Sequence, residues 1–465
     1  MNNIIQQIAK SVVENLEEVL INSLENKYNF ADIVEQLTIT GKKVTKDMLS
    51  YVLEELEVTI RDSTERKNKF TIHKREVPRK LLCDFGEIEF ERTYYKNKID
   101  GSYTYLLDNF LDIAKSQRIE TNLRSKLYKN STKMSYQEAV NIFTNGEISR
   151  QSVLNIIQEI EKIDNLELEI PEKKEVKELF IEADEDHVAT QTKGNKEMKL
   201  ISVYEGKEKE SKSRRRTINK RSFTGTMSPE EIWFEVLDYI DQAYDLDKVK
   251  NIYIGGDGAS WIKRGIKIIP KSKYVIDSYH LEKYLKLVLN RYIEETGEIS
   301  EPSKLEIAIN NVDHKLYKEA LKNMEAHTDS SVNITNAYKY LRNQWEGIKN
   351  KIENPHVKIS AEGQVSHILS SRLSSRPLGW SEEGMDKMAR MRVYQDNGGD
   401  LEEYYLHKRK EKHKKARIIE LDQKVTTKRK TLYNNDYIGT NIEILSKSSG
   451  KWLKQWLNTD FLKSM

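Results

Sequence analysis

One stretch of the sequence indicates the fold most directly: Asn251-Ile252-Tyr253-Ile254-Gly255-Gly256-Asp257-Gly258. Its first half is a short run of β-favouring residues, which is typical of a buried strand. The Gly-Gly-Asp-Gly sequence that follows predicts a bend, because glycine adopts backbone conformations that other residues avoid. The stretch therefore predicts a strand with an aspartate, Asp257, directly after its end.

Further strands and helices are predicted on both sides of this stretch. Alternating or β-favouring runs predict strands at 179–184, 199–204, 221–225 and 274–277. Ser228-Pro229-Glu230 predicts the start of a helix, with serine as the N-cap and proline in the first turn. Residues 281–355 have a helical pattern, and Ser360 is expected to cap a later helix that carries Glu362. This order of elements predicts an α/β domain interrupted by a long helical stretch.

The N-terminal third has a different pattern. Apolar residues at four-residue spacing, beginning with Ile4, Ile8 and Val12, predict a packing or oligomerisation helix within 1–65. Around Asp84-Phe85-Gly86 the alternation changes to that of a small hairpin or sheet. The pattern predicts a mainly helical region that also contains a small β structure.

Two short helical patterns flank the turn Asn145-Gly146-Glu147, which is the spacing of a helix-turn-helix. In that motif the second helix enters the major groove and its N-terminal residues contact bases. The candidate base-reading residues are Arg150, Gln151, Ser152 and Asn155. Helical hairpins with no DNA-binding role share this spacing, so the motif alone leaves both interpretations open.

Composition limits the class of protein. The chain has 465 residues, 37% of them hydrophobic, which is enough apolar surface to form folded cores and excludes a disordered chain. Its apolar runs are shorter than the roughly 20 residues of a membrane helix, and we expect a cytoplasmic, nucleoid-associated protein with no membrane partner. A single cysteine excludes internal disulfides and cysteine-based zinc sites. The net charge is only +3, but basic residues cluster at 212–216 and 408–417.

Three acidic residues are candidates for a metal site: Asp184, Asp257 and Glu362. If these carboxylates converge, they repel each other unless a cation neutralises them. Hard oxygen ligands favour Mg²⁺ or Mn²⁺, and a pair of such ions supports phosphoryl transfer. Asp186 is an alternative first acid, because it projects from the same strand face as Asp184. Glu346 and Glu353 are alternatives to Glu362.

Several motifs resemble one known family. They are 181–188 (IEADEDHV), 255–261 (GGDGASW), 275–280 (VIDSYH), 85–87 with 92–95 (FGE, RTYY) and 371–377 (SRLSSRP). Together they resemble the DDE transposases of the ISLre-two family of bacterial insertion sequences and, more distantly, the mutator-like superfamily. The resemblance extends over most of the chain.

The resemblance implies an RNase H-like catalytic fold with a helical insertion before the third acid. It matches Asp184, Asp257 and Glu362 to the three catalytic, metal-binding acids, and Asp277 with His280 to an Asp-x-x-His signature. His280 is then expected to contact a phosphate or position a strand, although a capping pair explains the same spacing. Candidate contacts to DNA phosphates are Arg214, Arg215, Arg216, Arg372 and Arg376.

These inferences combine into one expectation: a DNA transposase that binds terminal inverted repeats and joins them to target DNA with two Mg²⁺ or Mn²⁺ ions. Cutting two ends together implies a homodimer or higher oligomer on DNA. A catalytically inactive sequence-specific DNA-binding protein and a metal-dependent nuclease are the alternatives. The predicted regions are an N-terminal helical segment (1–65), a small β-containing region (66–118), a helix-turn-helix domain (119–170), a catalytic core in two parts (171–280 and 358–400), a helical insertion (281–357) and a basic C-terminal region (401–465).

Overall fold

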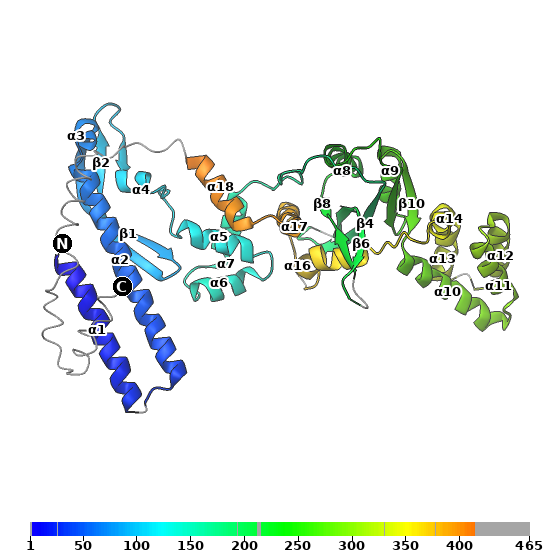
Figure 1. Cartoon of the computed structure of the whole chain (residues 1–465), viewed down its shortest axis with the longest axis horizontal. Coiled ribbons are helices and arrows are strands. Elements are labelled where there is room, and N and C mark those ends of the chain that lie inside the picture. The colour runs from blue at the N-terminus through cyan, green and yellow to red at the C-terminus, as the bar shows by residue number, and fades with distance from the viewer. Residues whose placement is uncertain are drawn as a thin grey trace. The chain divides into compact units, whose positions relative to one another are not determined.

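The computed structural model describes residues 2–25, 27–192, 194–211, 215–329, 331–376 and 378–413 (Figure 1). The chain divides into two compact units. Unit 1 comprises Met1–Leu127, Gln137–Arg150 and the described residues from Tyr405 onward. Unit 2 comprises Tyr128–Tyr136 and Gln151–Tyr404.

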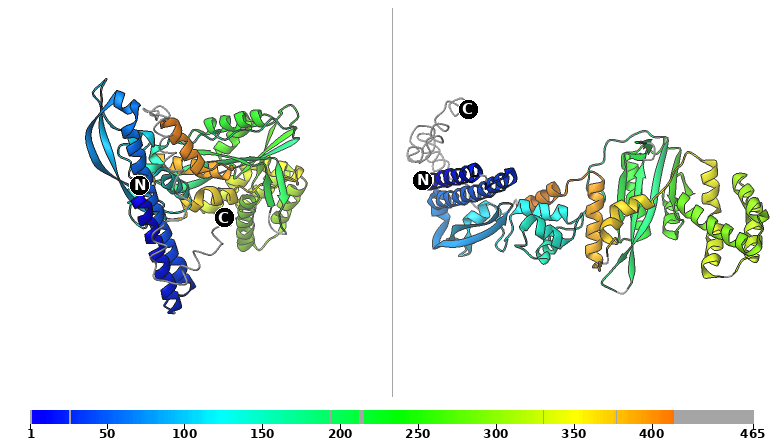
Figure 2. Two further views of the ribbon diagram at one scale, coloured as in Figure 1. Left: turned by 60° about the vertical axis from the view of Figure 1, so that its left-hand side comes forward. Right: turned by 90° about the horizontal axis from the view of Figure 1, so that it is seen from below.

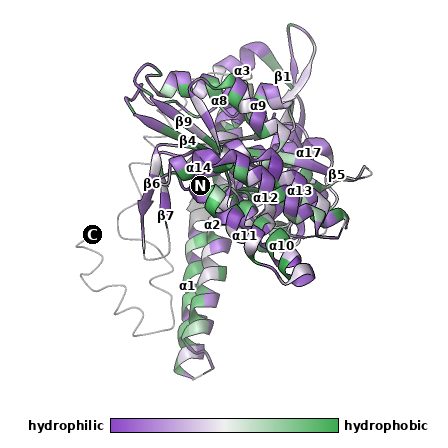
Figure 3. Ribbon diagram, turned by 90° about the vertical axis from the view of Figure 1, so that its right-hand side faces the viewer, coloured by the Kyte–Doolittle hydropathy of each residue, from purple (hydrophilic) through white to green (hydrophobic). Residues whose placement is uncertain are grey.

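Unit 1 contains a long helical hairpin and a small sheet. The hairpin helices are α1 (Asn2–Leu24) and α2 (Phe30–Asp62), and Asn29 caps α2 in a capping box with Asp32. Strands β1 (Phe70–Cys83), β2 (Gly86–Asn97) and β3 (Tyr103–Tyr105) form an antiparallel sheet, bordered by α3 (Thr64–Lys69) and α4 (Leu106–Phe110). Figure 3 shows hydrophobic segments along the hairpin, and the apolar side chains of Phe30 and Leu24 are exposed. The predicted helical N-terminus and small β region are therefore present.

Unit 2 is built on a five-stranded mixed sheet. Its strands are β4 (Glu178–Ala189), β5 (Asn195–Tyr204), β8 (Arg221–Gly225), β9 (Asn251–Gly256) and β10 (Ser272–Ile276), in the order β10-β9-β4-β5-β8. β9 runs parallel to both β4 and β10, whereas β5 is antiparallel to β4 and β8. A separate hairpin consists of β6 (Gly206–Lys209) and β7 (Arg215–Ile218) and is strongly hydrophilic (Figure 3). The predicted strands are thus all found in one sheet.

Helices α8 (Pro229–Ala243) and α9 (Ser260–Ile268) cover one face of the sheet. Leu179, Ile181 and Ala183 of β4 pack there against Trp233 and Ile262. Ser228 caps α8 as predicted, in a capping box with Glu231. Two details differ from the sequence-based expectation. A helix, α9, replaces the short connection expected after Asp257, and β4 continues to Ala189, so Asp184 lies within the strand and not at its end.

A group of helices follows β10 with no strand between them, as predicted. They are α10 (Ser278–Thr296), α11 (Ser300–Asn310), α12 (His314–Ala326), α13 (Val332–Asn343) and α14 (Trp345–Glu353). In the right view of Figure 2 these green to yellow helices lie beside the sheet of unit 2. They share a core of their own, which includes Tyr317, Tyr338 and Trp345.

The opposite face of the sheet is covered by the chain that returns from these helices. It forms α15 (Glu362–Val365), a π-helical turn η1 (Ser366–Ser370), α16 (Ser371–Leu373) and α17 (Glu382–Asp396). η1 contacts β4 and α17 contacts β8, where Ser222 Oγ donates a hydrogen bond to Asp396. Ser360 does not cap α15, because the residue before the helix is Ala361 and it makes no side-chain capping bond.

The remaining helices are α5 (Thr121–Asn130), α6 (Tyr136–Thr144), α7 (Arg150–Glu159) and α18 (Leu401–His413). The division between the two units falls between Arg150 and Gln151, at the start of α7. Across the described residues, no helix combines the length and apolarity required to span a membrane.

Candidate functional site

The register of the parallel strands β4, β9 and β10 brings three aspartates to the same level along the strands, beyond the carboxyl ends of β9 and β10. Glu182 of β4 pairs with Gly255 of β9, so two residues further on Asp184 is level with Asp257. On the other side of β9, Gly256 pairs with Ile276 of β10, and Asp277 is the next residue. Ligand and catalytic groups in α/β proteins gather at this end of the strands, because the carboxyl ends of parallel strands meet there.

The carboxylate of Asp184 has a raised pKa, and the charge of Asp257 contributes to the rise. Burial raises the pKa of Asp184 to about 6, and the negative charge of Asp257 adds to that increase. The backbone N–H of Glu185 donates a 2.9 Å hydrogen bond to Asp184. This bond lowers the pKa of Asp184, but by less than burial raises it. The site therefore concentrates negative charge in a partly desolvated position, which is where a cation is most favourable.

Asp277 and His280 form a pair at the start of α10. Asp277 is buried and its Oδ1 accepts hydrogen bonds from the backbone N–H groups of Tyr279 (2.7 Å) and His280 (3.3 Å), so it is the N-cap of α10. His280 Nδ1 lies 3.6 Å from Asp277 Oδ1. Asp277 raises the pKa of His280 above its ordinary value against the effect of burial, and the charges of Asp257 and Asp184 contribute to the rise. His280 thus lies near enough to Asp184 and Asp257 for their charges to raise its pKa.

The glycines around Asp257 are required by close approach of other elements. A Cβ on Gly255 would overlap the side chain of Ile359, and a Cβ on Gly256 would overlap the carbonyl oxygen of Ala183 and the side chain of Ile262. Gly258 has φ +89°, and a Cβ there would overlap the Gln344 amide. The glycine pattern therefore does more than form a turn: it allows the chain around Ile359 to lie directly on β9.

Glu182 is a site residue that the sequence-based reasoning missed. It is 2% exposed and lies on the same face of β4 as Asp184. Its Oε1 accepts hydrogen bonds from Tyr204 Oη (3.0 Å), Lys207 Nζ (2.6 Å) and the backbone N–H of Ser360 (2.9 Å). The signal that could have identified it is a glutamate between Ile181 and Ala183 in an otherwise apolar run, since buried carboxylates require partners.

Glu362 is near this face but is not joined to the aspartates. It is the first residue of α15, which contacts β4, and its side chain is exposed. In the described part of the chain, no hydrogen bond or ion pair connects it to Asp184 or Asp257, and no group of three or more His, Cys, Asp or Glu side chains is arranged to hold a metal ion. The structure thus brings together Asp184, Asp257 and His280, and leaves Glu362 apart.

The alternative acids occupy other environments. Asp186 is buried on the same face as Asp184, and its carboxylate accepts a 2.8 Å hydrogen bond from Ser374 Oγ. Glu346 is exposed in the first turn of α14, and Glu353 is exposed at the end of that helix. Asp184, the other candidate on β4, lies where the charge of Asp257 raises its pKa.

The predicted base-reading residues lie at the start of α7. Arg150, Gln151 and Asn155 are exposed, Ser152 is half-buried, and Gln151 donates a 2.9 Å hydrogen bond to Asn155. Because the boundary between the units separates α6 from most of α7, the helix-turn-helix stays a prediction.

The predicted phosphate contacts have different environments. Arg214 lies outside the described residues, while Arg215 and Arg216 are exposed on β7 and so belong to a hairpin, not to the loop that we expected. Arg376 is exposed. Arg372 is buried: its Nε donates to the Ser131 carbonyl (2.9 Å) and its guanidinium lies 4.9 Å from the Trp380 ring. Burial argues against a direct DNA contact by Arg372.

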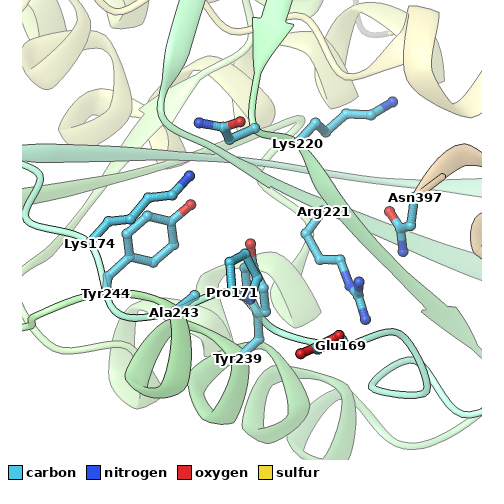
Figure 4. Close-up of a pocket in the computed structure, with 10 residues that line it drawn as sticks. Glu169, Pro171, Lys174, Lys220, Arg221, Tyr239, Ala243, Tyr244 and Asn397 are labelled. Atoms are coloured by element: carbon cyan, nitrogen blue, oxygen red, sulfur yellow. The ribbon is translucent and has the colours of Figure 1, made fainter.

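A pocket away from the aspartates is lined by Lys220 and Arg221 at the start of β8, and by Lys174 (Figure 4). Its three cations already have internal partners. Lys174 pairs with Glu205 (3.2 Å) and Lys220 with Asp396 (2.9 Å), while Arg221 donates to the carbonyl of Asn165 (2.9 Å). Arg221 thereby joins β8 to the chain before β4, Lys174 joins that chain to the end of β5, and Lys220 joins the start of β8 to α17, so the pocket is part of the scaffold.

Comparison with known proteins identifies relatives over almost the whole chain. The model of an uncharacterised protein family, UPF0236, matches residues 23–410. UPF0236 protein TTE0402 of Caldanaerobacter subterraneus subsp. tengcongensis is 38% identical over 445 residues, which cover 93% of this chain and 88% of that protein. A second protein of the same organism, named TTE0610/TTE0881/TTE1053/TTE2432, is also 38% identical over 445 residues, covering 93% of both chains. The chain therefore belongs to the UPF0236 family.

Proposed function

We propose that the chain is the DNA transposase of an insertion sequence and that its catalytic centre lies at the carboxyl ends of β9 and β10, beside Asp184 of the longer strand β4. The observation that carries this proposal is the placement of Asp184 and Asp257 at the same level of adjacent parallel strands, close enough for the charge of Asp257 to raise the pKa of Asp184. Two half-buried carboxylates side by side, one of them with a raised pKa, are a candidate functional site.

The sheet supports an RNase H-like core. β4, β5 and β8 are neighbouring antiparallel strands, with the β6–β7 hairpin between β5 and β8 in the chain. β9 then adds parallel to β4 and β10 adds parallel to β9, each preceded by a helix on the same face. The helical segment α10–α14 is inserted between β10 and the chain that carries Glu362. This is the arrangement expected from the resemblance to DDE transposases.

The donor set fits a hard divalent cation in part. Asp184 and Asp257 offer carboxylate oxygens, which are the ligands that Mg²⁺ and Mn²⁺ prefer. When bound, two such ions supply activation of the attacking oxygen and stabilisation of the leaving oxygen in a phosphodiester. Glu362 completes the set only if its side chain turns from solvent towards β4.

Two contacts keep Glu362 within reach of that position. The Ser360 N–H bonds to Glu182, two residues before Asp184 on the same strand face, and Ile359 rests on Gly255, two residues before Asp257. Glu362 follows Ser360 by two residues. His280, which Asp277 holds in place and keeps more readily protonated, would face a phosphate that approaches the aspartates.

The names of the relatives give independent support. One UPF0236 protein of the same organism, 38% identical over 414 residues, has a name that joins eleven locus designations, and another joins four. A protein name that joins several designations of one genome is what a mobile element present in several copies would produce. We extend that interpretation to this chain as part of the proposal.

One observation favours a second candidate. The exposed position of Glu362 is also expected of a sequence-specific DNA-binding protein that has lost catalysis. The test is to incubate the full chain with a plasmid that carries the ends of its own DNA element, in Mg²⁺ or Mn²⁺, and to analyse nicked and joined products. Nicking by the parent that is lost in Asp257→Asn supports the transposase. If the parent does not nick DNA and Asp257→Asn binds DNA as well as the parent, the result supports the DNA-binding protein without catalysis.

A further inference from the structure

A pocket of about 570 Å³ opens beside Asp257, between the start of α9, α10 and α13. It adjoins the proposed catalytic site, because Tyr340 Oη donates a 2.7 Å hydrogen bond to the carbonyl oxygen of Asp257. Gly258, the residue after Asp257, forms part of its wall. A pocket of this volume is within the range of roughly 300–1,000 Å³ that is typical of small-molecule sites.

The walls of the pocket offer an aromatic surface and an unsatisfied hydrogen-bond acceptor. The Tyr284 and Tyr340 rings lie 4.2 Å apart, centroid to centroid, and both line the pocket. Gln344 is 4% exposed, and its buried Oε1 has no hydrogen-bond partner among the described residues. Buried amide oxygens are almost always paired, so this enclosed oxygen can accept a hydrogen bond from a ligand N–H group when the Gln344 side chain, which lines the pocket, turns towards it.

The charge of the pocket is positive. Lys263 and Lys339 line it, and the described lining residues include no carboxylate. Lys263 is half-buried and donates a 3.1 Å hydrogen bond to the Asn343 carbonyl, while Lys339 is exposed at the rim. Two lysines beside a pair of tilted tyrosine rings in contact are a combination that can bind the phosphate and the base of a single strand.

We infer that this pocket takes one unpaired nucleotide of the DNA strand whose phosphate lies at Asp257. The lysines contact its phosphates, a tyrosine ring stacks on its base, and the Gln344 oxygen accepts a hydrogen bond from the Watson–Crick edge of that base. In a duplex those N–H groups are already paired, so the pocket distinguishes a frayed or single-stranded end from intact duplex. The inference rests on the proposed function and names the form of DNA that its site accepts.

Binding without chemistry tests the inference. The full chain is titrated in EDTA with two labelled DNAs that share one duplex, one blunt and one with a three-nucleotide single-stranded extension. We expect the parent to bind the extended DNA at least tenfold more tightly. Lys339→Gln and Gln344→Ala should reduce that preference to threefold or less and leave affinity for the blunt DNA unchanged.

Lys322→Gln, an exposed substitution on α12 outside the pocket, is the matched control and should retain the full preference. Because Gln344 is buried and its substitution can disturb folding, the result for Lys339→Gln decides the test. Equal binding of both DNAs by the parent overturns the inference, as does the same preference in Lys339→Gln and Lys322→Gln. If the parent prefers the extended DNA but never cleaves DNA, the proposed transposase is refuted and this inference is supported.

Discussion

The backbone N–H of Ser360 donates a 2.9 Å hydrogen bond to the buried carboxylate of Glu182, across 178 residues of sequence. This contact fixes the returning chain on the face of β4 that carries Asp184, two residues before Glu362. A carboxylate that no sequence motif singled out thereby positions the predicted third acid.

We expect Glu182→Ala to impair both stability and activity. The substitution leaves Lys207 Nζ and Tyr204 Oη without their buried acceptor, which should lower the free energy of unfolding by about 2–4 kcal/mol. Chemical denaturation and a cleavage assay measure the two effects. Glu208→Ala, on the exposed hairpin strand β6, is the control and should change neither. An active Glu182→Ala chain would show that this contact does not position Glu362.

The pH dependence of stability should report on Asp184. Its folded-state pKa of about 6 is above the ordinary value of 3.8, so its contribution to stability is present below about pH 4 and is lost as the pH rises through about 6. In metal-free buffer at pH 7.5, Asp184→Asn should therefore raise the free energy of unfolding by about 1–3 kcal/mol. Denaturation at pH 4, 6 and 7.5 measures the change. Exposed Glu362→Gln should stay within about 0.5 kcal/mol of the parent.

Divalent cations should stabilise the chain through the same two aspartates. At 100 times its dissociation constant, a bound ion adds about 2.7 kcal/mol, which thermal unfolding detects as a rise in Tm. We expect Mn²⁺ to raise the Tm of the parent, and the effect to weaken below about pH 6 as protons compete for Asp184.

Two aspartate variants provide the matched comparison. Asp257→Asn should abolish the Mn²⁺ effect, whereas Asp186→Asn should preserve it, because an amide oxygen can still accept the hydrogen bond from Ser374. The reverse result would assign the first acid to Asp186.

A methyl group at Gly255 should disturb the site from a distance. In Gly255→Ala the new Cβ overlaps Ile359, so the chain that leads to Glu362 must move away from β9. Overpacking of this kind costs about 1–3 kcal/mol, and we expect cleavage to fall by at least tenfold. Gly41→Ala, in the open interior of α2, is the control and should be neutral or stabilising. Full activity in Gly255→Ala would separate this packing contact from function.

The parts of the fold that depend on local sequence could be predicted. Ser228 caps α8, Asp257 follows β9 and Asp277 precedes α10, because short apolar runs, caps and glycines act within a few residues. The extent of β4 could not be predicted, since Asp184, Glu185 and Asp186 resemble a polar turn. Only tertiary contacts explain them: Glu185 bonds to Trp261 on one face, and Ser374 bonds to Asp186 on the other.

The candidate site also combines features that could be predicted from the sequence with features that could not. The convergence of Asp184 and Asp257 could be inferred from strand order, because parallel strands end at the same edge. The position of Glu362 could not, since it depends on Ile359 resting on Gly255 and on Ser360 bonding to Glu182. Contacts between residues more than a hundred positions apart leave no local pattern.

The central claim is that Asp184 and Asp257 together support metal-dependent cleavage and joining of DNA. The most direct measurement follows joined donor–target products from a plasmid carrying the element ends, with Mg²⁺, for the parent, Asp184→Asn, Asp257→Asn and Asp186→Asn. We predict joined products from the parent and from Asp186→Asn, and a loss on the order of 10²–10³-fold in the other two. Products that form equally well in Asp257→Asn, or a parent that never cuts DNA in Mg²⁺ or Mn²⁺, would contradict the claim.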